Sequence, residues 1–428
     1  MSIKTLHITN SYHGSSGGIR TFYRALLEAA DRHRREVRLI VPGAQDSIEE
    51  VGRYARIYTI SAPRSPVFDS RYRLLLPHLY ALPYESKLKK ILRYERPDLI
   101  EICDKYTLCF LPGILRLQRD CGAATPVMVG LSCERLDDNI LAFVSGHALG
   151  RSFANWYMAT VYGPRFDCHI SNSDYTASEL RRALAHRPDL EIHVCPMGVD
   201  RKGFNPRRRT QHTRQDLLAR LSDTSARETR LLLYVGRISS EKNVPLLLDM
   251  MEFLVRDPSA DYRLVVAGSG PKAKWLAGMA ALRTPQRTLF VGQIDDRERL
   301  ADLYAACDAL IHPNPREPFG IVPLEAMASG LPVIVPASGG VLSYANPANA
   351  WIAPPTGLGF ADEVRKIFAD EPLRQARVQQ GLQTAAEFDW PSVTKRFFAL
   401  YDELHDRSVG INPRLMIPPV TPVAIPAI

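Results

Sequence analysis

The sequence contains the stretch PREPFGIVPLEAMASGLPVI at residues 315–334, directly after a predicted strand at 309–312. The apolar residues of this stretch predict a helix at 321–329 and a further strand at 332–335. A strand, a helix and a second strand in this order are typical of a parallel sheet with a right-handed crossover. Glu317 lies in the loop before the helix, and Glu325 lies eight positions later on the helix. The stretch therefore predicts two carboxylates beside the end of a buried strand.

The start of this predicted helix has the features of a phosphate site. Gly320 lets the backbone approach a ligand closely. The amides of Gly320, Ile321 and Val322 point out of the helix N-terminus, where hydrogen bonds and the helix dipole favour an anion. Glu325, one turn inside the helix, can accept hydrogen bonds from two ribose hydroxyls, while Glu317 can face a sugar. The alternative is a surface loop with a capping glutamate.

The same alternation of strand and helix extends outward in both directions. It stops at CPMGVDRKGFNPRRRT (195–210), which we interpret as a linker. The sequence therefore predicts an α/β protein with two Rossmann-like, doubly wound parallel sheets that face each other across a cleft, since ligands of such folds bind at the carboxyl edges of the strands. Strands are predicted at 3–9, 37–41, 99–103, 127–131, 168–171, 231–235, 264–267 and 288–291, and helices at 19–30, 244–255, 272–281, 297–306 and 391–404.

Cations follow one of the predicted strands, in YVGRISSEKN (234–243). Gly236 ends the strand, and Arg237 and Lys242 follow in the loop. Two cations at the carboxyl edge of a strand can offset the charge of a diphosphate. The alternative interpretation is a solvated turn. Together with the 315–334 stretch, the two cations favour a diphosphate site over this turn.

Glycines follow two other strands. Gly17 and Gly18 lie in SYHGSSGGIR (11–20), and Gly268 lies in AGSGP (267–271). Neither segment is a GxGxxG fingerprint or a phosphate loop with a Walker lysine, which argues against NAD binding and against P-loop chemistry. We interpret Gly17 and Gly18 as a backbone cradle near phosphates. Gly268 is either part of the same donor site or a simple turn.

The bulk composition excludes several classes of protein. The 428 residues carry a net charge of +8, which favours an anionic partner such as a nucleotide diphosphate or an anionic membrane face. No nucleic-acid recognition motif accompanies the charge. The seven cysteines include no CxxC pair, which argues against a zinc site and fits a reducing cytoplasm. No signal peptide or spanning segment is predicted, so we expect a cytoplasmic protein that is at most peripheral at the inner membrane face.

These motifs resemble the group 1, family 4 retaining glycosyltransferases of the GT-B fold. The strings that carry the resemblance are SSGGIRTFYRALLEAA, SNSDYTASEL, CPMGVDRKGFNP, YVGRISSEKNVPLLLDMM, LVVAGSGP and EPFGIVPLEAMASGLPVI, and the resemblance extends over about residues 5–355, which include both domains. The resemblance implies an N-terminal acceptor domain at 1–197 that a C-terminal helix at 388–405 completes, and a donor domain at 198–387. The proline-rich residues 409–428 are expected to form an irregular tail.

The resemblance also implies roles for single residues. Arg237 and Lys242 would hold the donor diphosphate, Glu325 the ribose, and Glu317 the sugar. No metal and no cofactor are expected, since the cations and the helix dipole replace a metal. The full donor-binding set is Gly17, Gly18, Gly236, Arg237, Lys242, Gly268, Ile294, Glu317, Phe319, Gly320, Ile321 and Glu325, and the catalytic set is Glu317, Cys133, Arg237 and Lys242.

One position departs from the family pattern. Relatives of the mannosyltransferase type carry a string similar to SHERLD after the fourth or fifth strand of the first domain, where this chain has VGLSCERLDD (129–138). Cys133, or Ser132 in another alignment, replaces the histidine. Cys133 then either faces the donor sugar or is a buried, inert core residue. Glu134 and Asp137 either assist the reaction or cap the loop.

The function that follows is transfer of a hexose from a nucleotide diphosphate sugar to a hydroxyl of a glycan or lipid-linked acceptor. GDP-mannose is the first candidate donor and a UDP-sugar the second. The alternatives are a sugar-nucleotide epimerase on the same fold and a non-catalytic protein that binds sugar nucleotides.

Overall fold

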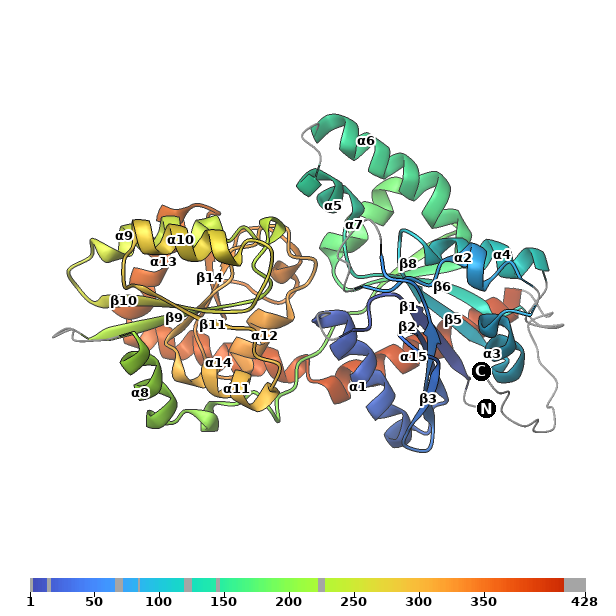
Figure 1. Ribbon diagram of the computed structural model, residues 1–428, viewed down its shortest axis with the longest axis horizontal. Helices are drawn as coiled ribbons and strands as arrows, with labels where there is room; N and C mark the ends of the chain where they lie inside the picture. Colours follow the sequence, from blue (N-terminus) through green and yellow to red (C-terminus); the bar gives the residue numbers. More distant parts are fainter. Residues whose placement is uncertain are drawn as a thin grey trace. The chain divides into compact units, whose positions relative to one another are not determined.

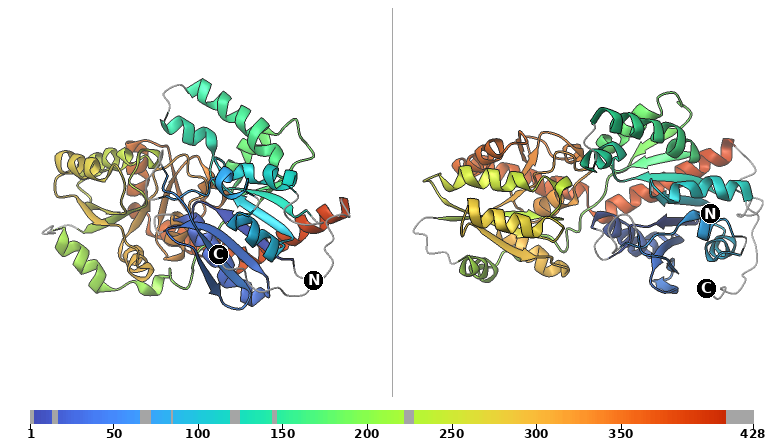
Figure 2. Two further views of the ribbon diagram at one scale, coloured as in Figure 1. Left: turned by 45° about the vertical axis from the view of Figure 1, so that its right-hand side comes forward. Right: turned by 45° about the horizontal axis from the view of Figure 1, so that its top comes forward.

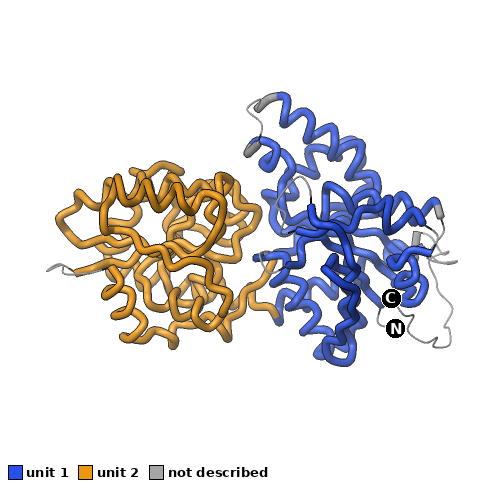
Figure 3. Tube along the Cα trace, in the orientation of Figure 1, with its two compact units in different colours: residues 1–196, 391–428 blue, residues 197–390 orange. Residues whose placement is uncertain are grey.

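The computed structural model describes residues 3–13, 17–65, 72–83, 85–118, 125–143, 147–221 and 228–411. The chain divides into two compact units, which Figure 3 shows in different colours. Unit 1 comprises residues 1–196 and 391–428, and unit 2 comprises residues 197–390. Each unit is a sheet covered by helices on both faces (Figures 1 and 2).

Unit 1 has an eight-stranded sheet in the order β3-β4-β2-β1-β5-β6-β7-β8. All neighbouring strands are parallel except β3 and β4, which form an antiparallel pair. The strands are β1 (Thr5–Thr9), β2 (Val37–Gly43), β3 (Ser47–Val51), β4 (Ala55–Ser61), β5 (Leu99–Cys103), β6 (Val127–Ser132), β7 (Cys168–Ser171) and β8 (Glu191–Val194).

Helices cover both faces of this sheet, and its central strands β1 and β5 are buried on both sides. Leu92, Leu115 and Leu180 pack on one face with the sheet residues Leu6 and Ile8. On the other face, the rings of Phe22 and Phe397 lie 4.7 Å apart. The helices are α1 (Gly18–His33), α2 (Pro77–Tyr80), α3 (Lys87–Glu95), α4 (Leu111–Gln118), α5 (Leu136–Phe143), α6 (His147–Tyr157), α7 (Asp174–Ala183) and α15 (Trp390–Ile411).

A buried polar cluster fixes α15 to the sheet of unit 1. The carboxylate of Glu101, on β5, accepts hydrogen bonds from the hydroxyls of Tyr23 (3.0 Å) and Tyr401 (2.5 Å) and lies 2.9 Å from His7 Nδ1. All of these side chains are buried. Because a buried carboxylate is costly without partners, the cluster holds the C-terminal helix in one position.

Unit 2 has a six-stranded sheet in the order β11-β10-β9-β12-β13-β14, in which all pairs are parallel. The strands are β9 (Thr229–Val235), β10 (Asp261–Ala267), β11 (Thr288–Gly292), β12 (Ala309–Ile311), β13 (Val333–Pro336) and β14 (Trp351–Ala353). Helices α9, α10 and α13 lie on one face and α8, α11, α12 and α14 on the other (Figure 1). These helices are α8 (Gln211–Arg220), α9 (Pro245–Val255), α10 (Ala273–Arg283), α11 (Arg297–Ala306), α12 (Ile321–Ala328), α13 (Gly357–Ala369) and α14 (Glu371–Glu387).

Most predicted strands and helices occur within a few residues of their expected positions, but three differences matter. The first sheet is not entirely parallel, because the hairpin of β3 and β4 adds an edge that was not predicted. The short edge strands β8 and β14 were also missed. Helix α15 continues to Ile411, past residue 409 where the tail was expected to begin, and the rest of the tail, 412–428, lies outside the described residues. Within the described ranges, no helix combines the length and the hydropathy needed to cross a bilayer.

Candidate active site

Glycines allow the loops after β9 and β10 to lie against each other at the carboxyl edge of the unit 2 sheet. Gly236 N–H donates to the carbonyl of Ala267 (3.0 Å). Gly268 has a φ of +144°, and a Cβ on it would lie 1.9 Å from the Gly236 carbonyl oxygen. No other residue fits there, so Gly236 and Gly268 bring two loop backbones together at this edge.

An ion pair joins the loops after β9 and β12, which are neighbouring strands. Lys242 Nζ donates to Glu317 Oε2 at 2.8 Å, and Asn314 Nδ2 donates to the same oxygen at 2.9 Å. His312 Nε2 lies 3.5 Å from it. The backbone is tied as well, because Asn243 Nδ2 donates to the carbonyl of Pro313 (3.1 Å). The structure therefore brings two of the predicted site residues, Lys242 and Glu317, into direct contact.

These neighbours keep Glu317 ionised. Burial by itself raises the pKa of the carboxyl, but the charge of Lys242 and the contact with His312 outweigh it and hold the pKa well below its usual range. A carboxylate held in this way is a poor proton donor and a weak nucleophile. It is suited to orienting Lys242 and to accepting hydrogen bonds.

The N-terminus of α12 presents backbone donors beside this ion pair. Gly320, the residue before the helix, has a φ of +88°. No side chain accepts a hydrogen bond from the backbone amides at this end of the helix as a cap. A Cβ there would lie 3.2 Å from Glu317 Cγ and from the Tyr344 hydroxyl. The first turn of α12, which starts at Ile321, has no acidic residue. Its amides can therefore bind an anion by hydrogen bonds and by the helix dipole.

Glu325 is buried on α12 with few partners. Its Oε2 accepts a hydrogen bond from the Tyr304 hydroxyl at 2.9 Å. Burial raises the pKa of the carboxyl to about 7, although the charge of Arg297 acts in the opposite direction. Near neutral pH the group therefore changes between a form that donates a hydrogen bond and a form that only accepts.

The other predicted donor-site residues are placed as follows. Arg237 is exposed after β9, and its carbonyl accepts from the Tyr234 hydroxyl (2.9 Å). Ile294 is half-buried in the loop after β11. The side chain of Phe319 is buried, with its ring 5.3 Å from that of Tyr344, so only its backbone can reach a ligand. In unit 1, Gly17 and Gly18 are exposed at the start of α1.

Cys133 lies directly after β6, at the carboxyl edge of the unit 1 sheet. Its side chain is half-buried and makes a hydrogen bond with the thiol of Cys103, the last residue of β5. That hydrogen bond, and then burial, raise the pKa of the Cys103 thiol. Cys133 is therefore not a fully buried core residue.

The two acidic residues after Cys133 differ in their surroundings. Asp137 is buried and forms ion pairs with Arg135 (2.6 Å) and Arg182 (2.8 Å). These ion pairs give Asp137 a role in the structure of the loop. The Glu134 carboxyl accepts a hydrogen bond from Asn139 (2.9 Å), and burial raises its pKa. Of the two, only Glu134 has the features of a group that assists a reaction.

Three residues of the site were not predicted from sequence. His312 and Asn314 contact Glu317, and Tyr304 binds Glu325. The sequence HPNPREPFG did contain a signal, since a histidine and an asparagine directly follow an apolar strand. Tyr304 lies on α11 among core residues, and nothing in the local pattern marks it.

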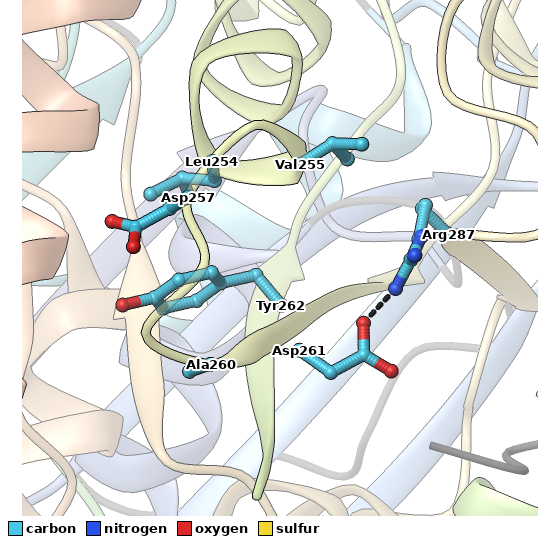
Figure 4. Close-up of a pocket in the computed structure, with 7 residues that line it drawn as sticks. All are labelled: Leu254, Val255, Asp257, Ala260, Asp261, Tyr262 and Arg287. Atoms are coloured by element: carbon cyan, nitrogen blue, oxygen red, sulfur yellow. Dashed lines mark ion pairs between the residues drawn. The ribbon is translucent and has the colours of Figure 1, made fainter. Parts of the chain in front are cut away.

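Two cavities lie elsewhere, toward the amino ends of the unit 2 strands. Figure 4 shows the one of about 290 Å³, whose lining includes Tyr262 and the ion pair of Asp261 and Arg287. It is far along β10 from the glycine loops, so it is separate from the candidate active site. In the part of the chain that the structure describes, no group of three or more histidine, cysteine, aspartate and glutamate side chains is arranged to hold a metal ion.

Comparisons with known proteins agree on one family. The model described as "Glycosyl transferases group 1" matches residues 221–384, and the model described as "Glycosyltransferase Family 4" matches residues 16–202. A GDP-mannose-dependent alpha-(1-6)-phosphatidylinositol dimannoside mannosyltransferase of Mycobacterium tuberculosis is 31% identical over 334 residues, which cover 78% of this chain and 79% of the relative. A GDP-mannose-dependent alpha-mannosyltransferase of Corynebacterium glutamicum is 28% identical and covers 79% of this chain and 73% of its own. The structure of a sucrose-phosphate synthase from Thermosynechococcus elongatus aligns with a TM-score of 0.70 and 22% identity, over 94% of this chain and all of that one, which shows the fold.

Proposed function

This chain belongs to the group 1, family 4 glycosyltransferases with the GT-B fold, and we propose that it transfers mannose from GDP-mannose to a hydroxyl group of a glycolipid or glycan. Two mannosyltransferase relatives use GDP-mannose, and one of them acts on a phosphatidylinositol mannoside. Membership of the family favours glycosyl transfer over the epimerase and the non-catalytic alternatives. The observation that carries the proposal is the Lys242–Glu317 pair beside the uncapped N-terminus of α12.

In the proposed mechanism the α-configuration of the sugar is retained by front-side attack. Lys242, Arg237 and the amides at Gly320 and Ile321 stabilise the leaving diphosphate, which deprotonates the acceptor hydroxyl. Glu317 orients Lys242 and binds sugar hydroxyls. The low pKa of Glu317 and its three polar neighbours support this role over that of a covalent nucleophile. No metal or cofactor takes part in the proposal.

The donor is tested by incubating the protein with GDP-mannose, UDP-glucose and UDP-galactose in the presence of a phosphatidylinositol mannoside. We expect release of nucleotide diphosphate together with a mannosylated lipid from GDP-mannose only. Transfer from a UDP-sugar at an equal or higher rate would overturn the donor assignment while leaving the family unchanged. Binding of every nucleotide without transfer would contradict catalysis.

Glu325 gives donor binding a pH dependence. Because the pKa of its carboxyl is about 7 in the free protein, it is mostly protonated at pH 6 and mostly ionised at pH 8. Ribose hydroxyls donate to the ionised form, so the affinity for GDP should rise by about tenfold between these pH values, as expected when one protonation state binds across a pKa. Glu325→Gln should bind more weakly and lose this slope.

Titration of GDP by calorimetry at pH 6, 7 and 8 measures the effect. The β-phosphate of GDP also titrates in this range, but it does so equally with both proteins. The difference between the wild type and Glu325→Gln therefore isolates the carboxyl. Parallel slopes for the two proteins would show that Glu325 does not contact the ribose.

We further propose that the protein binds a membrane surface from the cytoplasmic side through α6. Leu149, Phe153 and Trp156 lie on one face of this helix at spacings of four and three residues, and they are 80%, 53% and 54% exposed. Figure 1 shows α5 and α6 projecting from the rest of unit 1. The helix contains Arg151 and no acidic residue, and the chain has a net charge of +8. These features favour the interface of an anionic bilayer, where a lipid acceptor is found.

Replacing Phe153 and Trp156 with serine should reduce binding to vesicles that contain phosphatidylinositol by about tenfold or more, since an aromatic side chain contributes about 1.5–3 kcal/mol when it leaves water. Co-sedimentation with vesicles measures this. Trp275→Ser is the matched control, because Trp275 is 41% exposed on α10 of unit 2. Equal losses of vesicle binding in the double variant and in Trp275→Ser would contradict the membrane role. So would a wild-type protein that binds no vesicles and forms dimers through this patch, as measured by analytical ultracentrifugation.

A further inference from the structure

Unit 2 contains a second candidate site, which is lined by arginines. It lies at the amino ends of the strands, whereas the candidate active site lies at their carboxyl ends. A cavity of about 330 Å³ lies near the amino ends of β9, β12 and β13, and its lining includes Arg209, Arg230 and Arg374. Arg230 is the second residue of β9, and Arg374 lies in the first turn of α14. The glycine loops, Lys242 and Glu317 lie at the carboxyl ends of β9, β10 and β12 in the same sheet. The cavity is therefore separate from the donor site within unit 2.

The charges of the lining are unbalanced. Against the three guanidinium groups stands one carboxylate, Asp308. Asp308 is already engaged, because it accepts from Arg209 at 3.2 Å, from Arg214 at 3.0 Å and from the backbone of Leu231 at 2.8 Å. The charged groups of the lining thus sum to about +2, which matches a phosphate monoester dianion.

The remaining ion pairs of these arginines are at the surface. Arg230 donates to Glu228 and Arg374 to Glu371, and these two glutamate side chains are 66% and 52% exposed. The arginine side chains themselves are only 19% and 22% exposed, but ion pairs whose partner lies in water contribute little to stability, typically about 0–1 kcal/mol. Arg230 and Arg374 can therefore exchange these partners for a ligand at small cost.

Phe368 holds the two guanidinium groups in place. The guanidinium carbons of Arg230 and Arg374 lie 4.6 Å and 5.5 Å from the centroid of its ring. Among the described residues, the buried Nε of Arg230 finds no hydrogen-bond acceptor. Burial, and after it the positive charge of Arg230, lowers the pKa of Arg374. An anion placed between the two arginines would offset this repulsion.

We propose that this cavity binds a phosphorylated small molecule through Arg209, Arg230 and Arg374. The planar fork of donors on a guanidinium matches phosphate oxygens, and bidentate pairs of this kind are among the stronger hydrogen bonds. The volume lies at the lower end of the range for ligand pockets, which suits a ligand about the size of a sugar phosphate rather than a nucleotide sugar. The site itself does not depend on the proposed donor or acceptor, and only the use of GDP to occupy the donor site in the test rests on the proposed function.

The test uses the full chain saturated with GDP, so that the donor site is occupied. Glycerol 3-phosphate and inorganic phosphate are titrated into it by calorimetry. We expect one further site that prefers glycerol 3-phosphate, and an affinity about tenfold or more weaker in Arg230→Gln/Arg374→Gln. Arg256→Gln is the matched control, since Arg256 is exposed at the end of α9 outside this cavity, and it should bind as the wild type does.

The proposal would be overturned by no binding to the GDP-saturated wild type, by an equal loss in Arg256→Gln, or by a loss in Lys242→Ala as large as in the double variant. The loss in Lys242→Ala would place the signal at the donor site. If the double variant melts at a lower temperature, Arg374→Lys replaces it, because it keeps the charge and removes the fork. Binding to vesicles of phosphatidic acid but not to glycerol 3-phosphate would also exclude a soluble ligand.

Discussion

Lys242→Ala is expected to weaken the binding of GDP by about tenfold or more, while the binding of guanosine changes little. A charge-assisted hydrogen bond contributes about 1.5–3 kcal/mol, and in the proposed complex this contribution goes to the diphosphate alone. A second effect acts in the same direction. Without Lys242, the Glu317 carboxylate loses a partner at 2.8 Å and places an uncompensated negative charge beside the phosphates. Calorimetric titration of both ligands measures the difference.

A double variant separates the two effects. Lys242→Ala/Glu317→Ala removes the repelling carboxylate together with the lysine, so it should bind GDP more tightly than Lys242→Ala alone. Lys366→Ala is the matched control, because Lys366 pairs with Glu363 on the exposed face of α13. If Lys242→Ala weakens GDP and guanosine equally, the lysine does not contact the diphosphate.

Glu317→Ala is expected to lower kcat by about a hundredfold, with a smaller change in the KM for GDP-mannose. The loss of a single preorganised group that acts on the transition state commonly costs about 10²–10³ in kcat. Here the change would release Lys242, Asn314 and His312 from their shared oxygen. Steady-state kinetics with varied donor distinguishes the two constants.

Glu317→Gln provides the control for this variant. Glutamine keeps the size of the side chain and can still accept a hydrogen bond from Lys242, but it does not carry the charge. It should therefore recover part of the lost rate. A rise in KM with unchanged kcat in both variants would show that Glu317 contributes to binding of the ground state only. The melting temperatures of the two proteins exclude unfolding as the cause.

The central strands of both sheets could be predicted because each is a short apolar run between polar loops. β5 and β7 occur at the predicted residues, and β1, β9 and β10 within three residues. The edges were missed for a physical reason. β3 has the sequence SIEEV and four of its five residues are exposed, so it has no buried face to mark it as a strand. β14 has only three residues, and its register depends on β13.

The candidate site could be predicted only in part. The residue types of Lys242, Glu317 and Glu325 indicated diphosphate, sugar and ribose contacts, and the structure places all three in unit 2. That Lys242 pairs with Glu317 depends on β9 and β12 being neighbours in the sheet, although β10 and β11 separate them in the sequence. The raised pKa of Glu325 depends on burial, which outweighs the charge of Arg297 and the hydrogen bond from Tyr304, and no local pattern shows that burial.

The most direct test of the account is the configuration of the product. GDP-mannose carries mannose in the α-configuration, and the enzyme is supplied with a phosphatidylinositol mannoside as acceptor. NMR of the isolated glycolipid then identifies the new glycosidic bond. The account predicts an α-linked mannose and one GDP released for each bond formed. A β-linked mannose, or release of GDP with free mannose only, would contradict retaining transfer to this acceptor.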